Sequence, residues 1–327
     1  MKRLISLLLM LLLLAGCSAG SGEQETETID VVLDWYPNAV HAFLYQAIDK
    51  GYFEEEGLTV NILFPVGNSD PLSMPAAGRA DIGFYYEEDI IIAKANEDVP
   101  VKVLGTVVQE PLAVIASLRE KGITTPADLI GKTIGHTGIP FNEVAIAELL
   151  ASVGATLDDV TLVDVGFDLM SAMTTGNVDA TYGCFLNHEL PALEHEGFAM
   201  DSIRVTDHGV PSHYALVLVT GEEMLAQNED KYRRFLRACQ KGFLEMKNDP
   251  EGSLDLMMES QNAENFPLTR EVEKVSFDIL LPMMEKDGAP FLSQDAAVWQ
   301  ENIDWLREKG MIETTFSPEE ILVDLLS

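Results

Sequence analysis

Four side chains that can bind a small molecule are crowded near the start of the chain: Asp34, Trp35, Asn38 and His41. They follow the run 29–33, in which apolar residues alternate with polar or smaller ones, as in a half-buried strand. The proline at position 37 and the helix-capping Asn38 indicate that this strand ends here and that a helix over about 39–50 begins. Because open α/β sheets bind ligands at such strand ends, we expect these four residues to form part of a binding site.

A second set of aromatic and polar side chains follows other predicted strands. Its members are Tyr85, Glu87, Phe141, Asn142, Phe185, Asn187 and Glu189. Flat rings can enclose a flat ligand, and aromatic contacts contribute about 0.5–1.5 kcal/mol beyond burial. A buried carboxylate is costly unless it is paired, so Glu87 or Glu189 would need an N–H donor from that ligand. The set therefore predicts a planar, amino-bearing ligand. We assign Tyr86 and Tyr182 to the hydrophobic core.

The elements that carry these residues occur twice. A glycine, an aspartate three residues later, a short apolar strand and an aromatic end occupy 78–87 and again 176–185. Each copy is preceded by a predicted strand and helix, over 29–33 and 39–50 in the first and over 132–135 and 142–153 in the second. This repetition predicts two related βαβ lobes.

A mature chain of about 300 residues also exceeds what one core normally holds. We expect lobe one to comprise 29–118 and 211–327, and lobe two to comprise 119–210. The unbroken apolar run 214–220 reads as a buried parallel strand that returns the chain to lobe one. Two crossings would form a hinge. The helical patterns at 229–247, 250–260, 270–286 and 296–309 would complete lobe one.

The N-terminus has the features of a secretory signal peptide. Lys2 and Arg3 precede the apolar run 4–14, which is shorter than the roughly 20 residues of a membrane span. The sequence Leu14-Ala15-Gly16-Cys17 resembles a bacterial lipobox, which implies a signal peptide over 1–16 and a diacylated Cys17. The alternative is an ordinary signal peptide cut near Ala19. Residues 17–28 are rich in Ser, Gly, Glu and Thr, and we interpret them as a tether.

The net charge of the chain and the motifs that it lacks exclude several other classes of function. A formal net charge of -33 would repel a phosphate backbone, so we expect no nucleic-acid partner. No P-loop, dinucleotide fingerprint or nucleophile elbow is present, and no pair of histidines has helical zinc-site spacing. We therefore expect no cofactor, no metal and no catalytic residue, and a monomer. Cys184 and Cys239 could form a disulfide, but buried free thiols are the favoured interpretation.

Several stretches together resemble the substrate-binding lipoproteins of ABC importers for thiamine pyrimidine precursors. They are Asp34-Trp35-Tyr36-Pro37-Asn38 with His41, Lys50-Gly51-Tyr52-Phe53, Glu56-Gly57-Leu58, Gly78-Arg79-Ala80-Asp81-Ile82-Gly83 and Gly131-Lys132-Thr133-Ile134-Gly135. The resemblance covers about 29–248. It implies a type II periplasmic-binding-protein fold that closes over formylaminopyrimidine or a similar ring and presents it to an ABC permease. It also implies that Trp35, Asn38 and His41 line the cleft, and that Glu189 binds the amino group of the ring.

The resemblance leaves other ligands and functions open. His188 stands where the family often has an aromatic residue, so a riboflavin, alkanesulfonate or taurine binder of the same fold is an alternative. The related thiamine pyrimidine synthases are the enzyme alternative. That branch carries a cysteine-rich run where 209–214 has no cysteine, and a catalytic histidine where this chain has Glu87, Glu88 and Asp89. A structural lipoprotein without a ligand is a third class. We expect an extracytoplasmic binding protein, anchored to the cell membrane through Cys17.

Overall fold

The computed structural model describes residues 26–261, 267–286 and 288–327. The expected signal peptide, Cys17 and most of the tether lie outside these residues. Glu27 and Thr28, which we assigned to the tether, instead begin the first strand, because their backbones pair with Leu58 and Thr59. Within the described ranges, no helix combines the length and the apolar character needed to cross a bilayer.

Lobe one is built on a five-stranded sheet with the strand order β2-β1-β3-β10-β4. The strands are β1 (Glu27–Val32), β2 (Leu58–Leu63), β3 (Ile82–Tyr85), β4 (Val101–Val108) and β10 (Leu216–Gly221). Its early helices are α2 (Ala42–Asp49), α3 (Tyr52–Glu55), α4 (Asp70–Ala76) and α5 (Glu87–Glu97), with a 3-10 turn η1 (Ala39–His41) before α2. The later helices are α9 (Glu222–Gln227), α10 (Glu229–Asn248), α11 (Pro250–Ser260), α12 (Arg270–Met284) and α13 (Ala296–Glu308), followed by η6 (Pro318–Glu320).

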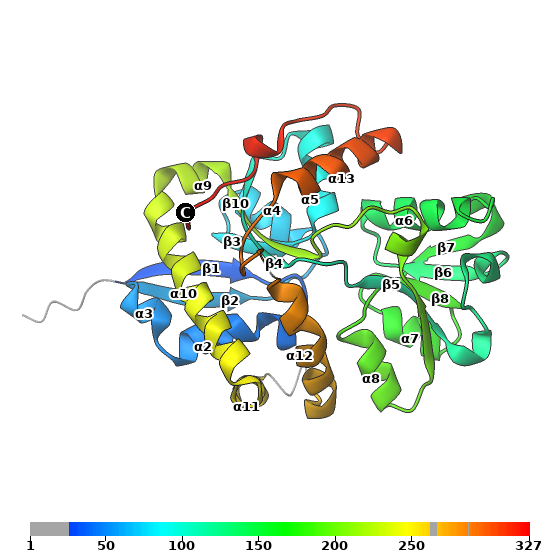
Figure 1. Cartoon of the computed structure of the whole chain (residues 1–327), viewed down its shortest axis with the longest axis horizontal. Coiled ribbons are helices and arrows are strands. Elements are labelled where there is room, and N and C mark those ends of the chain that lie inside the picture. The colour runs from blue at the N-terminus through cyan, green and yellow to red at the C-terminus, as the bar shows by residue number, and fades with distance from the viewer. Residues whose placement is uncertain (1–25, 262–266, 287) are drawn as a thin grey trace, which may run out of the picture.

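Lobe two has its own five-stranded sheet with the order β7-β6-β8-β5-β9. The strands are β5 (Ala113–Leu118), β6 (Thr133–His136), β7 (Thr161–Asp164), β8 (Ala180–Phe185) and β9 (Met200–Ile203). The helices are α6 (Pro140–Ala151), α7 (Leu169–Thr174) and α8 (Glu189–His195), with short 3-10 turns η2 (Arg119–Lys121), η3 (Pro126–Leu129), η4 (Leu157–Asp159) and η5 (Val205–His208). Figure 1 shows the two lobes side by side, with α12 beside α8 where they meet.

Two chain segments connect the lobes, and the first lies earlier than expected. We placed β5 in lobe one, with the boundary after residue 118, but β5 pairs with β8 and β9 in the second sheet. The first crossing is therefore 109–112, between β4 and β5. The second is 209–215, between η5 and β10. The expected parallel arrangement of 214–220 is also wrong, because β10 runs antiparallel to both of its neighbours, β3 and β4.

The predicted repetition of a βαβ pattern corresponds to matching halves of the two sheets. β1 is parallel to β2 and β3, and β6 is parallel to β7 and β8. The repeated aspartates have the same role, since each accepts a hydrogen bond from the backbone N–H of a residue in the first parallel strand of its lobe. Asp81 Oδ2 lies 2.8 Å from Asp30 N, and Asp179 Oδ2 lies 3.1 Å from Thr133 N. The repeated aspartate is therefore a structural residue that joins adjacent strands.

The C-terminal helices complete the hydrophobic core of lobe one. α10 lays its apolar face on α2, and Gly242 permits this close approach, because a Cβ there would overlap the Phe43 carbonyl oxygen. Trp299 of α13 is fully buried where that helix packs against α5, and Trp305 is partly buried. Cys184 and Cys239 are buried free thiols, as predicted, and lie in different lobes.

Candidate functional site

The lobes contact each other across a cleft that contains two adjoining chambers. The Glu189 chamber is lined by Asp34, Trp35, Asn38, Val40 and Tyr86 of lobe one and by Thr137, Leu169, Gly183, Phe185, Asn187, His188 and Glu189 of lobe two. The Asp89 chamber is lined by Tyr86, Glu88, Asp89, Leu112, Ala113, Thr137, Ile139, Phe141, Asn142, Tyr182, Gly183, Phe185, His213 and Ala215. Their empty volumes, including the open space at their mouths, are about 450 Å³ and 480 Å³.

The opening cluster of the sequence forms one wall of the Glu189 chamber. Asn38 caps η1, since its Oδ1 accepts a hydrogen bond from Val40 N at 3.1 Å. His41 Nδ1 accepts from Asn38 N at 3.3 Å, so the ring proton lies on Nε2, which is 3.0 Å from Asp34 Oδ1. His41 is fully buried and lines neither chamber. Its position indicates that it orients Asp34 and Asn38 rather than touching a ligand.

Trp35 closes this chamber against the opposite lobe. Its ring centroid lies 4.3 Å from that of Phe167 at an interplanar angle of 76°, an edge-to-face contact. Phe167 lies in the loop between β7 and α7, and nothing in the sequence marked it as a site residue. A second contact between the lobes joins the Asn68 side-chain amide to the Thr137 carbonyl oxygen. The structure therefore describes the cleft in a closed arrangement.

Acceptors for a ligand lie on the lobe-two side of the chamber, at the start of α8. Asn187 donates from Nδ2 to Ser276 Oγ at 2.9 Å, whereas its buried Oδ1 has no hydrogen-bond partner among the described residues. Glu189 Oε2 accepts from Phe185 N at 2.7 Å. A carboxylate oxygen has more than one lone pair, so Glu189 can accept a further hydrogen bond. Two buried acceptors are thus available next to the aromatic walls.

His188 connects this wall to α12 of lobe one. Its Nδ1 lies 3.2 Å from Glu189 Oε1, and its Nε2 lies 3.7 Å from Glu273 Oε1. Burial alone would lower the pKa of His188, but the Glu189 carboxylate and then the Glu273 and Asp34 charges raise it to about 9. Glu273 Oε2 also accepts from Ala39 N at 2.7 Å, at the start of η1. The cationic ring therefore links acids from both lobes. No local pattern in the sequence identifies Glu273 as a site residue.

The structure changes the assignments around residue 86. Tyr85 and Glu87, both expected in the site, line neither chamber. Tyr85 instead borders a groove between α4 and α5, and Glu87 is fully buried, where its Oε2 accepts from Tyr214 N at 2.6 Å. Tyr86, which we assigned to the core, lines both chambers, and its hydroxyl lies 3.5 Å from Asp34 Oδ2. The reason is the position of the turn: Tyr86 is the extended N-cap residue between β3 and α5.

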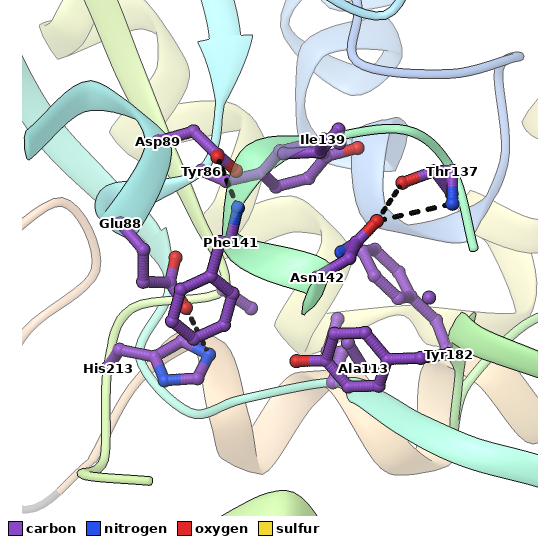
Figure 2. A pocket seen from close by; sticks show the side chains of 14 residues that line it. Tyr86, Glu88, Asp89, Ala113, Thr137, Ile139, Phe141, Asn142, Tyr182 and His213 are labelled. Atoms are coloured by element: carbon purple, nitrogen blue, oxygen red, sulfur yellow. Dashed lines mark hydrogen bonds and ion pairs between the residues drawn. The ribbon is translucent and has the colours of Figure 1, made fainter. Parts of the chain in front are cut away.

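The Asp89 chamber contains predicted residues from lobe two and acids from lobe one, which Figure 2 shows facing one another. Phe141 and Asn142, both expected in the site, line this chamber from the first turn of α6, which begins two residues earlier than the predicted helix. Tyr182, which we assigned to the core, also lines this chamber although only 1% of it is exposed to solvent. The acids are Glu88 and Asp89, and Asp89 Oδ1 lies 3.4 Å from Phe141 N across the cleft.

Charge in the Asp89 chamber is largely compensated. His213 Nε2 lies 2.6 Å from Glu88 Oε1, and its Nδ1 lies 3.1 Å from the Pro211 carbonyl oxygen, so a doubly protonated ring has an acceptor at each nitrogen. Burial would lower the pKa of His213, but the Glu88 charge raises it. Burial, and then the Glu88 charge, raise the pKa of Asp89 well above its usual range, which favours the neutral acid.

The lining of both chambers lacks some groups that other chemistries require. Neither chamber is lined by a lysine or an arginine. Among the residues that the structure places, no group of three or more His, Cys, Asp or Glu side chains is arranged to hold a metal ion. The arrangement instead combines aromatic rings, buried acids and amides in an enclosed cleft. It can hold a flat, uncharged or amino-bearing molecule by stacking and hydrogen bonds.

Known proteins resemble this chain in sequence and in fold. Residues 38–253 match the profile of the family described as NMT1/THI5 like. The formylaminopyrimidine-binding protein of Halalkalibacterium halodurans is 41% identical over 313 residues, which cover 95% of this chain and 94% of that relative. The 4-amino-5-hydroxymethyl-2-methylpyrimidine phosphate synthase of Aspergillus parasiticus is 27% identical, over 90% of this chain and 86% of the enzyme.

The solved structures confirm the fold predicted from the sequence. The alkanesulfonate-binding protein SsuA of Xanthomonas axonopodis pv. citri bound to MOPS superposes with a TM-score of 0.71 and 14% identity, covering 92% of this chain and 99% of that one. SsuA of Escherichia coli gives a TM-score of 0.69 and 17% identity, with 90% and 97% covered. The two α/β lobes with a double crossing therefore form a type II periplasmic-binding-protein fold. Together, the profile match and the extensive sequence identity establish that the chain belongs to the NMT1/THI5-like family.

Proposed function

We propose that this protein is the extracytoplasmic solute-binding component of an ABC importer and that it captures formylaminopyrimidine or a closely related aminopyrimidine. The observation that carries this proposal is the pair of acceptors at the start of α8. The unpartnered Oδ1 of Asn187 and the carboxylate of Glu189 lie beside Trp35 and Phe185, which can stack on a flat ring. An exocyclic amino group has two N–H donors and matches such a pair of acceptors. The name of the relative from H. halodurans agrees with this chemistry.

The same chamber argues against a sulfonate ligand. A sulfonate group is an anion and needs donors or cations around it. In the Glu189 chamber it would instead face the carboxylates of Asp34 and Glu189, and the cationic ring in the lining, His188, already has Glu189 and Glu273 as partners. The likeness to the alkanesulfonate-binding proteins thus supports a shared fold, and the charge of the site favours a different ligand.

Binding rather than catalysis is the function that these residues support. Three acids in the cleft have partners within the protein and thereby stabilise the fold or the closed arrangement. Asp34 bonds to His41, Glu189 accepts from Phe185 N, and Glu88 pairs with His213. Capture would occur by hinge closure, in which contacts to both lobes bias a pre-existing equilibrium between open and closed states. We propose that the distantly related synthases have the same fold and use it for catalysis instead of transport.

The location of the protein follows from its N-terminus in this proposal. A signal peptide over 1–16 would be removed, and lipid on Cys17 would anchor a monomer to the cell membrane through the tether. Anchoring would keep the protein beside its permease, which receives the ligand from the closed lobes. Metabolic labelling with a radioactive fatty acid should mark the unaltered chain and fail to mark a Cys17→Ser variant.

Mass spectrometry of small molecules released from the purified, denatured protein tests the ligand directly. We expect an aminopyrimidine, and we expect calorimetry with aminopyrimidines, riboflavin and taurine to give saturable binding only for the aminopyrimidines. Recovery of a flavin or a sulfonate instead, with matching calorimetry, would replace the proposed ligand. Absence of a thermal shift with every heterocycle would favour a structural lipoprotein.

A further inference from the structure

The two lobes also touch outside the ligand chambers, where the end of α13 in lobe one meets α6 of lobe two. Figure 1 shows the C-terminal end of α13 next to α6. Four residues make this contact, and we call them the outer clasp: Trp305 and Lys309 at the end of α13, and Phe141 and Glu148 on α6. Trp305, Lys309 and Glu148 line neither chamber, so most of the clasp lies outside the ligand site.

The spacing of the clasp residues places each pair on one face of its helix. Lys309 follows Trp305 at position i+4, and Glu148 follows Phe141 at position i+7. Lys309 Nζ lies 2.7 Å from Glu148 Oε2, and the ring centroids of Trp305 and Phe141 are 6.2 Å apart at an interplanar angle of 57°. Lys309 Nζ also lies 5.7 Å from the centroid of the Trp305 ring, a cation–π distance. The ion pair and the ring contact are therefore neighbours and can act together.

The ion pair of the clasp is partly shielded from solvent. The side chains of Lys309 and Glu148 are 26% and 20% exposed. Among the residues that the structure describes, it is the one pair of a lysine or arginine with an acid that joins the two lobes. The interlobe contact of His188 with Glu273 is more deeply buried, with side chains 19% and 1% exposed. Because salt screens exposed charges more than buried ones, added salt should act on lobe closure chiefly through the clasp.

Opening of the cleft would separate the two halves of the clasp. Phe141 lies in the first turn of α6, which forms a wall of the cleft, and its backbone N lies 3.4 Å from Asp89 Oδ1 of lobe one. Withdrawal of that wall from Asp89 moves α6 with the rest of lobe two. α13 stays with lobe one, because it packs against α5 there and its Trp299 and Ile303 are fully buried. The clasp thus joins two bodies that move apart when the cleft opens.

We propose that the outer clasp is a latch that stabilises the closed form of the protein from outside the ligand site. This inference rests on the proposed function, since it takes hinge closure as the mechanism of capture. A contact made only in the closed form shifts the equilibrium by its own free energy, whichever molecule occupies the cleft. The clasp therefore strengthens the binding of different ligands by the same factor and makes that binding sensitive to salt.

A double-mutant cycle on the ion pair tests the clasp. Lys309→Met removes the charge and keeps an unbranched side chain, and Glu148→Gln keeps the shape of the acid. Calorimetry of the mature protein gives Kd for formylaminopyrimidine and for 4-amino-2,5-dimethylpyrimidine, in about 50 mM and about 500 mM NaCl. Lys121→Met is the matched control, because Lys121 Nζ lies 2.9 Å from Asp179 Oδ1 within lobe two and both side chains are 28% exposed.

Two further measurements accompany the cycle. Thermal unfolding of each variant checks that the fold is retained. Small-angle X-ray scattering of the ligand-free protein follows the separation of the lobes without relying on any ligand. Loss of the clasp should favour open molecules, so Lys309→Met should give a larger mean radius of gyration than the unaltered protein, and Lys121→Met should not.

We expect each single variant to weaken both pyrimidines by the same factor, about two- to fivefold at the lower salt concentration, which corresponds to one partly exposed ion pair. The double variant should lose no more than either single variant, because both changes break the same contact. The losses should shrink at the higher salt concentration, and Lys121→Met should change neither affinity.

Three outcomes of the calorimetry would overturn the clasp: unchanged affinity in the single variants, losses that add in the double variant, or losses that differ between the two pyrimidines. Failure of the unaltered protein to bind either pyrimidine would instead overturn the proposed ligand. Scattering would then decide on the clasp alone, and an unchanged radius of gyration in Lys309→Met would overturn it.

Discussion

Replacing Glu189 with glutamine tests the residue to which the ring amino group is assigned. Glutamine keeps a side-chain oxygen that can accept from Phe185 N, a bond of 2.7 Å in the structure, and removes the negative charge. Glu189 is 7% exposed, so solvent screens this charge only weakly. A hydrogen bond to a charged group contributes about 1.5–3 kcal/mol, so its loss corresponds to roughly a 10- to 150-fold weaker Kd.

The assay compares two ligands that differ only in the amino group. Calorimetry with 4-amino-2,5-dimethylpyrimidine should show the full loss in Glu189→Gln, because that ring donates to the carboxylate. Calorimetry with 2,5-dimethylpyrimidine should show a change of less than about threefold, since stacking on the aromatic walls does not use the charge. Glu194→Gln, on the exposed face of the same helix, should leave both affinities unchanged.

The ratio of the two losses in affinity distinguishes a direct role of Glu189 in binding the amino group from a structural role. If Glu189→Gln weakened both ligands equally, the acid would act by holding the loop at the start of α8 and not by binding the amino group. If neither affinity changed, the amino group would lie elsewhere in the cleft. Either result would refute the placement of the ring.

Three further predictions concern pH dependence, thiol reactivity and packing. The pKa of His188 is raised to about 9 from 6.5, so its contribution to the closed form is complete below about pH 6.5 and is lost as pH rises through 9. Ligand affinity should fall between these values in calorimetry, and Glu273→Gln should flatten the fall, whereas a flat profile in the unaltered protein would contradict the link between the lobes. Burial raises the pKa of Cys184 and of Cys239, so neither should react with Ellman's reagent in a native form of the chain that begins at residue 26, and both should react after denaturation. Gly83→Ala should reduce the free energy of unfolding in urea by about 3 kcal/mol or more, because a Cβ there would overlap a backbone carbonyl oxygen of α4, and a loss below 1 kcal/mol would show that α4 moves freely.

The fold was accessible from the sequence because its signals are local and repeated. Alternating apolar residues followed by a helix cap marked β1 and η1, and the glycine–aspartate pattern marked β3 and β8. Local sequence does not determine which of the two sheets a strand joins. β4 and β5 are both apolar and are separated by only a few residues, so only their pairing partners reveal that the chain crosses between them.

The candidate site was partly accessible for the same reason. The cluster from Asp34 to Asn38 and the segment from Phe185 to Glu189 were identified because each occupies the end of a strand. Around Tyr86, a difference of one residue in the position of the turn reverses which side chains face the cleft, and the sequence does not fix that position. Phe167 contacts Trp35 because the lobes close, and Glu273 contacts the start of η1 because α12 packs there within lobe one. Contacts over such sequence distances leave no local pattern.

Calorimetric titration of the mature protein with formylaminopyrimidine, in parallel with taurine, is the most direct test of the assignment. The aromatic walls and buried acceptors of the Glu189 chamber predict saturable one-to-one binding of the pyrimidine and no measurable binding of the sulfonate. Saturable binding of taurine without binding of the pyrimidine would contradict the account.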